Sequence, residues 1–286
     1  MPLMTSRDLW LQSRPFSFNL LRVFWNPISG SHLLINHKDN FNLTFRKLNM
    51  SNEIALVVGA GKGLSASLAR TLYTDGMKVI LAARNVEKLE TIGSEVNATL
   101  IKCDASDTNQ VEQLFEQIDD LSDHIDLVIY NPSVRVPGSI TEIDPVAAKK
   151  AIETTSFGAF LVARQAAIRM KKAGKGTILF TGASASVKGF PRSSIFAMGK
   201  FALRGLAQSL ARELHPSNIH IGHFVIDGQI LTLNHRDEVG SNKENSEDNE
   251  QQLNPDEIAK IYLQFHRHHK STWSWEIELR PKNERF

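Results

Sequence analysis

The chain lacks several features that would each assign it to a particular class of protein. It contains one cysteine, Cys103, among 286 residues, which excludes an intramolecular disulfide and is typical of a reducing compartment. No uninterrupted apolar run reaches the roughly 18 residues that a membrane-spanning helix needs, so we expect no membrane association. The net charge is only +2, and the main body has no dense patch of Lys and Arg. We therefore expect no nucleic-acid partner.

The first 50 residues differ in composition from the rest of the chain. They hold six Lys and Arg against two Asp, whereas acidic residues slightly outnumber basic ones in the remainder. Several serines and apolar clusters such as FNLLRVFW accompany these bases, a composition typical of an organellar transit peptide. A disordered extension is the alternative, and Met50 could be a second start. We predict residues 1–50 to be an N-terminal extension of a mitochondrial or a cytoplasmic protein.

From Asn52 onward, short apolar runs alternate with longer segments of helical period. This alternation predicts an α/β fold with a doubly wound parallel sheet, formed as a single domain by residues 51–286. The expected strands are 54–59, 78–83, 98–103, 125–130, 176–182, 219–226 and 273–279. The expected helices include 63–75, 108–119, 145–173, 193–214 and 256–268.

Two polar segments lie in the C-terminal part of the chain. Residues 233–255 form the one long polar stretch inside the domain, and a loop of this length is usually either a functional lid or disordered. Both interpretations stay open. His266–His269 could suggest a metal site, but no cysteine or carboxylate cluster accompanies them at ligand spacing. We interpret them as a solvated helix end and expect no metal.

Three glycines, Gly59, Gly61 and Gly63, lie between the first expected strand of the domain and the helix that follows it. Glycine lets the backbone turn sharply and approach a pyrophosphate, whose charge the N-terminus of the next helix stabilises. The position of this cluster at the start of a βαβ series makes it more specific than glycines alone. We predict a dinucleotide site here, with Leu64 as a further contact.

Two cations indicate which dinucleotide binds. Arg84 follows the second strand of the domain, where a carboxylate would hold the ribose hydroxyls of NAD, and an arginine suits a 2′-phosphate instead. Lys62 lies within the glycine turn and could reach the same phosphate. Together they favour NADP(H) over NAD, although each cation alone would more simply be a solvated surface charge.

These motifs resemble those of the short-chain dehydrogenase/reductase family over residues 52–280. The family's T-G-x-x-x-G-x-G pattern corresponds here to Val58, Gly59, Gly63 and Ser65, so that a serine replaces the last glycine. The resemblance implies a Rossmann fold. It also assigns cofactor contacts to further positions, which are Asp104, Asn131, Gly228, Ile230 and Thr232.

The catalytic positions depart from the family pattern. Family members use an Asn, Ser, Tyr, Lys set in which the tyrosine is the acid or base. Lys200 matches the lysine, which in the family also binds the nicotinamide ribose, whereas Phe196 stands at the tyrosine position. Ala183 stands at the serine position and Thr155 at the asparagine position. Ser184 is the replacement proton donor that we rank first, provided that a local turn re-aims it.

The resemblance therefore implies an NADP(H)-dependent oxidoreductase that acts on an unidentified carbonyl or alcohol with a substituted catalytic set. Because a positioned proton donor contributes ~10²- to 10⁴-fold to the rate, a pseudoenzyme is the alternative: an inactive NADP(H)-binding sensor or interaction protein. A small-molecule substrate and a homodimer or homotetramer are also implied.

Overall fold

The computed structural model describes residues 22–26, 31–35, 51–231 and 251–284, and the chain divides into two units, Met1–Asn49 and Met50–Phe286. In the first unit, β1 (Arg22–Asn26) and β2 (Ser31–Ile35) pair antiparallel. Most of residues 1–50 lie outside the described ranges. Their interpretation as a transit peptide or a disordered extension stays a prediction.

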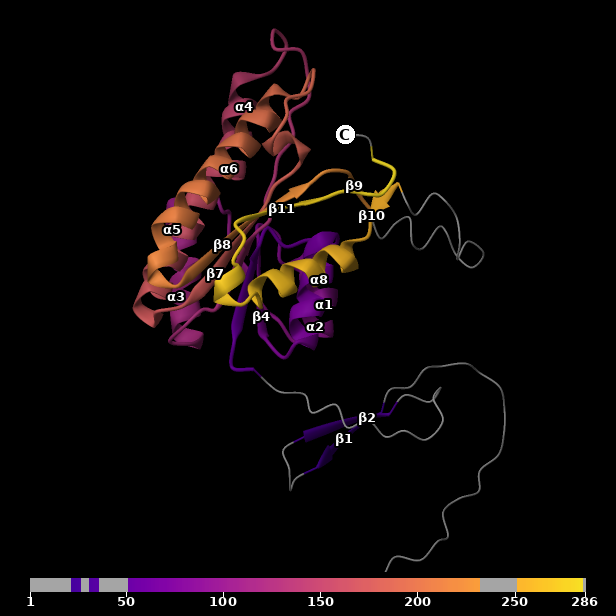
Figure 1. Cartoon of the computed structure of the whole chain (residues 1–286), viewed down its shortest axis with the longest axis vertical. Helices are drawn as coiled ribbons and strands as arrows, with labels where there is room; N and C mark the ends of the chain where they lie inside the picture. Colours follow the sequence, from indigo (N-terminus) through magenta and orange to yellow (C-terminus); the bar gives the residue numbers. More distant parts are fainter. Residues whose placement is uncertain (1–21, 27–30, 36–50, 232–250, 285–286) are drawn as a thin grey trace, which may run out of the picture. The chain divides into compact units, whose positions relative to one another are not determined.

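The second unit is built around a parallel sheet of seven strands in the order β11-β8-β7-β6-β3-β4-β5 (Figure 1). Every adjacent pair in this order is parallel. The strands are β3 (Ile54–Val58), β4 (Lys78–Ala83), β5 (Thr99–Lys102), β6 (Leu127–Tyr130), β7 (Gly176–Thr181), β8 (Ile219–Ile226) and β11 (Glu276–Leu279). This confirms the doubly wound fold. Strand order reverses between β3 and β6, and in such sheets ligands bind beyond the carboxyl ends of the strands at this point.

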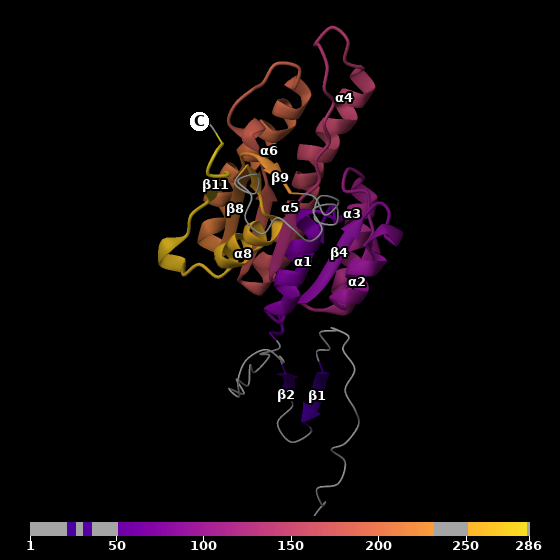
Figure 2. The same ribbon diagram turned by 90° about the vertical axis from the view of Figure 1, so that its right-hand side faces the viewer.

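Helices cover both faces of the sheet (Figures 1 and 2). Leu56 and Val58 of β3 belong to the apolar cluster shared with α3, α5 and α6, whereas Ala55 and Val57 belong to the cluster shared with α1, α2 and α8. Strands buried on both faces explain the continuous apolar runs in the sequence. The helices are α1 (Leu64–Thr74), α2 (Glu90–Glu95), α3 (Thr108–Leu121), α4 (Pro145–Ile152), α5 (Gly158–Ala173), α6 (Ser194–Leu214) and α8 (Pro255–His266). Among the described residues, no helix combines the length and the apolar character needed to cross a bilayer.

The structure departs from the expected elements at two places. A π-helical turn, Glu153–Phe157, separates α4 from α5 where the sequence suggests one continuous helix. The hydroxyl of Tyr130, at the end of β6, donates a hydrogen bond to the carbonyl of Thr154 inside this turn. The second departure lies in the polar stretch 233–255, whose last residues are ordered as β10 (Gln252–Leu253), paired with β9 (Gln229–Ile230). Residues 232–250 lie outside the described ranges.

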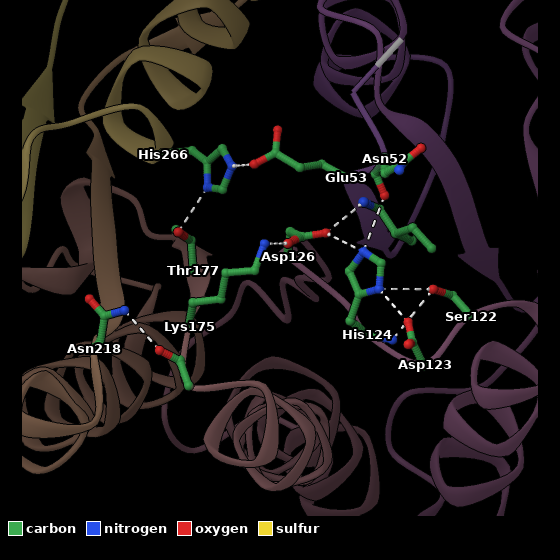
Figure 3. Close-up of polar contacts among 12 residues, drawn as sticks. Asn52, Glu53, Ser122, Asp123, His124, Asp126, Lys175, Thr177, Asn218 and His266 are labelled. Atoms are coloured by element: carbon green, nitrogen blue, oxygen red, sulfur yellow. Dashed lines mark hydrogen bonds and ion pairs between the residues drawn. The ribbon is translucent and has the colours of Figure 1, made fainter.

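A polar network supports the opposite edge of the sheet, where the strands begin (Figure 3). Buried Asp126 accepts a hydrogen bond from the backbone N–H of Ile54 at 2.9 Å and forms an ion pair with Lys175 at 2.7 Å. His266 is hydrogen-bonded to Thr177 at 2.8 Å, and its other ring nitrogen lies 3.6 Å from Glu53. The side chain of His266 is only 8% exposed. The sequence-based interpretation of this histidine as part of a solvated helix end is therefore wrong.

Glu53 provides a test of this network. The pKa of Glu53 is lowered mainly by its contact with His266, and the nearby Arg267 adds to the effect against the opposing influence of burial. A lowered carboxyl pKa stabilises the fold above the unfolded-state value and is lost as the pH falls. We expect Glu53→Gln to lower the free energy of unfolding by about 1–2 kcal/mol at pH 7. Denaturant titrations should show this difference shrinking as the pH falls below 4.5.

The matched control is Glu116→Gln, which changes an exposed carboxylate on α3. It should leave stability within about 0.5 kcal/mol of the wild type. A Glu53→Gln effect that stays constant from pH 7 to pH 3 would contradict an electrostatic role.

Candidate functional site

The glycine turn lies at the carboxyl end of β3. Gly59 has φ +76°, and a Cβ there would lie 2.6 Å from the ring of Pro132, so both the backbone conformation and the close approach require glycine. Added Cβ atoms at Gly61 and Gly63 would meet nothing within 4 Å. The N-cap of α1 is Gly63, which has no side chain to accept hydrogen bonds from the first N–H groups of the helix. The turn thus leaves open space in front of uncapped N–H groups, as an anion requires.

Ser65 and Asn131 connect this turn to the end of β6. The Ser65 hydroxyl donates to the carbonyl of Gly59 at 3.3 Å and accepts a hydrogen bond from the Asn131 amide at 2.8 Å. Ser65 is buried beside the buried Leu64. The serine that the resemblance places at the last glycine position thus has two hydrogen-bond partners, one within the turn and one directly after β6.

The two cations expected to bind a phosphate are exposed. Lys62 lies in the glycine turn and Arg84 directly follows β4. Asp104 follows β5 and accepts hydrogen bonds from the N–H and hydroxyl of Ser106. Burial alone would raise the pKa of Asp104, but these hydrogen bonds and the charge of Arg84 lower it overall. All three charged residues follow carboxyl ends of neighbouring strands, at one edge of the sheet.

The remaining expected cofactor residues lie beyond β8. Gly228 has φ +155°, and a Cβ there would lie 2.6 Å from Pro281. Ile230 belongs to β9. Thr232 lies outside the described residues, so its assignment stays a prediction.

Lys200 is buried in α6. Its Nζ donates a hydrogen bond to the backbone carbonyl of Thr181 at 2.7 Å and lies 5.9 Å from the centre of the Phe196 ring. Burial lowers the pKa of Lys200 to about 7, and the charge of Arg135 adds to this. The side chain of Lys200 therefore points into the protein from α6. It is not a surface lysine whose aliphatic part covers Phe196.

The residues that the family resemblance assigns to the other catalytic positions are packing residues in this structure. Phe196 packs with Ala183 and Ala185 in a small buried cluster. Thr155 is buried in the π-helical turn, where its hydroxyl accepts a hydrogen bond from the N–H of Val134 at 3.3 Å. None of these side chains is a free acid or base.

A cavity of about 380 Å³ lies between these residues and the loop after β6. Its lining includes Ser184, Ser193, Phe196 and Arg135. Ser184 begins a 3₁₀ turn, Ser184–Ser186, directly after β7, and this turn brings Ser184 to the wall of the cavity. The other hydroxyl in the turn belongs to Ser186, which is buried. It accepts a hydrogen bond from the backbone N–H of Ala183.

Two residues near the site were missed at the level of sequence. The guanidinium carbon of Arg135 lies 4.5 Å from the centre of the Phe196 ring; the available signal was a cation shortly after the fourth strand of the sheet. His223 of β8 is fully buried with its Nδ1 3.0 Å from Glu276. Burial lowers the pKa of His223 to about 4, against the opposing effect of Glu276. A histidine in an apolar strand gave no comparable signal.

The arrangement can be compared with known proteins. A family model described as a short chain dehydrogenase matches residues 53–237. The chain belongs to the short-chain dehydrogenase/reductase family. The seven-stranded parallel sheet flanked by helices is the fold of this oxidoreductase family.

Similar short-chain dehydrogenases come from distant organisms. A Drosophila melanogaster protein named dehydrogenase/reductase SDR family protein 7-like is 25% identical over 251 residues, covering 83% of this chain and 77% of the fly protein. Versicolorin reductase stcU of Emericella nidulans is 28% identical over 64% of this chain and 71% of its own length. The crystal structure of a short-chain dehydrogenase from Rhodopseudomonas palustris is 30% identical with a TM-score of 0.69, covering 81% of this chain and 99% of that chain.

Gly59 gives a direct test of the turn. We expect Gly59→Ala to destabilise the protein by at least about 1–3 kcal/mol, because alanine is strained at this φ and its Cβ meets Pro132. Gly61→Ala is the matched control, since its Cβ enters open space, and it should change stability by less than about 1 kcal/mol. Equal melting temperatures for the two variants would contradict the assigned turn geometry.

Proposed function

We propose that this short-chain dehydrogenase is an NADP(H)-dependent oxidoreductase that reduces a carbonyl group, or oxidises the corresponding alcohol, of a small-molecule substrate. The observation that carries the proposal is the cavity lined by Ser184 and Phe196 beside buried Lys200. It lies at the same edge of the sheet as the glycine turn, because the strands are parallel. A volume of about 380 Å³ is within the usual range of small-molecule sites.

The residues at this edge fit a nicotinamide dinucleotide. Gly61 and Gly63 leave the space that a pyrophosphate needs, and the uncapped start of α1 offers N–H donors. Lys62 and Arg84 would hold a 2′-phosphate, which favours NADP(H) over NAD. Solved structures of similar fold support this choice. They include an alcohol dehydrogenase from Thermococcus sibiricus complexed with 5-hydroxy-NADP, 22% identical with a TM-score of 0.71 and covering 82% of this chain and 99% of that chain.

When bound, the cofactor would supply or accept the hydride. Lys200 would hold the nicotinamide ribose through N–H groups that its bond to Thr181 leaves free. Reduction of a carbonyl also needs a proton at the oxygen, and Phe196 has none to give. Ser184 would donate its hydroxyl proton to that oxygen, and solvent would restore the proton to Ser184. The apolar wall formed by Phe196 would exclude water from the reacting carbon.

The experiment measures NADPH binding to the full chain by fluorescence and then NADPH oxidation over a panel of carbonyl compounds. We expect Lys200→Ala to weaken NADPH binding, and Ser184→Ala to lower kcat by about 10²-fold with binding unchanged. Phe196→Tyr should raise kcat by supplying a hydroxyl.

Ser209→Ala, which changes an exposed position on α6, is the control for Ser184→Ala. Gly61→Ala should weaken NADPH binding without loss of stability.

The outcomes separate the alternatives. NADPH binding without turnover in the wild type, with turnover gained in Phe196→Tyr, would favour an inactive NADP(H)-binding sensor. Failure of NADPH to bind at all would contradict both functions and leave the fold as a scaffold for another activity.

We further propose that the protein forms a homodimer or homotetramer through α5 and α6. These helices lie beside each other (Figure 1), and five large apolar side chains on or next to them are exposed: Phe157, Phe160, Ile168, Met198 and Phe201. Exposed apolar clusters of this kind mark interaction surfaces.

The oligomer is tested by sedimentation or light scattering. Phe201→Glu should shift the protein toward monomer by placing a charge in the contact. Tyr73→Glu changes a residue of similar exposure on α1, where Tyr73 is 45% and Phe201 46% exposed, and it should leave the mass unchanged. A wild-type mass equal to one chain would refute the proposed association.

A further inference from the structure

The cavity beside Phe196 has an unusual balance of charge. Its lining contains one cation, Arg135, together with the hydroxyls of Ser184 and Ser193, and the remaining walls are apolar. No acidic residue lies in the described lining. Arg135 is exposed to solvent and is the one charged residue of the described lining, so the electrostatic potential of the lining favours an anionic group on the ligand.

Arg135 is held in place by the phenyl ring, with no carboxylate bound to it among the described contacts. Its guanidinium carbon lies 4.5 Å from the centre of the Phe196 ring, the distance of a favourable cation–π contact. No hydrogen bond from the Arg135 guanidinium is found among the described contacts, and its N–H groups can therefore donate to a ligand. Lys188, by contrast, forms an ion pair with Asp227 at 3.1 Å, and the carboxylate of Asp227 neutralises its charge.

The start of α6 adds to the positive potential of the cavity. Ser193 lines the cavity and is the N-cap of α6, a helix of 21 residues, but its side chain makes no cap hydrogen bond. The partial positive charge at a helix N-terminus therefore acts in the same direction as Arg135. The rest of the lining is mostly apolar and includes Val136 and Phe190.

We propose that this cavity binds an organic carboxylate, with the carboxylate held by Arg135 and an aromatic or aliphatic body against Phe190 and Phe196. A carboxylate suits the site because the guanidinium can donate two parallel hydrogen bonds to it. The inference rests on the proposed function, and it makes the substrate an oxo acid or the matching hydroxy acid. Phe196 would thus contribute to substrate selection, because its ring holds Arg135 in place and Arg135 selects the substrate.

The test compares benzoylformate with its neutral methyl ester as probes, using the full chain with and without saturating NADPH, by calorimetry. We expect the wild type to bind the acid about 10- to 100-fold more tightly than the ester, the range expected for a charge-assisted hydrogen-bonded pair. Arg135→Gln should remove this preference while leaving ester binding and the melting temperature unchanged. Arg135→Lys should restore part of it, since the charge returns without the paired donors.

Arg212→Gln is the control, because it removes the same charge from an exposed site at the end of α6. It should keep the full preference for the acid. Equal binding of acid and ester by the wild type, or a preference that survives Arg135→Gln, would overturn the inference.

The same measurements separate this inference from the proposed function. Binding of the acid through Arg135 in a protein that does not bind NADPH would support the carboxylate site and refute the oxidoreductase. NADPH oxidation with neutral carbonyl compounds and none with oxo acids would support the oxidoreductase and refute the carboxylate site.

Discussion

The parallel alignment of the strands is the constraint on which the rest of the structure depends. Because each crossover returns the chain to the same end of the sheet, every strand ends at one edge, and residues from distant parts of the sequence meet there. The glycine turn after β3, Arg135 after β6 and Ser184 after β7 all lie at this edge for that reason. The opposite edge carries the network of Asp126, Glu53 and their partners, which supports the starts of the strands.

Phe196 shows how a family position can change its chemistry and keep its place. The ring is packed with Ala183 and Ala185 in a small apolar cluster, and Phe196 and Ala183 are the residues that the family resemblance assigns to the tyrosine and serine positions. Lys200 remains buried beneath them, bonded to the carbonyl of Thr181. The guanidinium carbon of Arg135 lies 4.5 Å from the centre of the ring. Burial lowers the pKa of Lys200, and the charge of Arg135 adds to this effect.

Several contacts of the site depend on local geometry that only folding creates. The 3₁₀ turn after β7 re-aims Ser184, which would otherwise follow the alternation of an extended strand. The π-helical turn buries Thr155 against the loop after β6, where its hydroxyl holds the N–H of Val134. These irregular segments lie next to the cavity, as is common at functional sites.

The sequence by itself determined the sheet, its seven strands and the glycine turn. Apolar periodicity and turn chemistry are local properties, and Gly59 is required by its own φ as well as by Pro132. The lysine of α6 was found through motif spacing, which is also local. Only the tertiary structure decided that Arg135 stacks on Phe196, that Ser184 rather than Ser186 lines the cavity, and that His266 is buried against Glu53 and Thr177. Each of these depends on the distance between segments far apart in the chain, and that distance exists only after the sheet and its helices have packed.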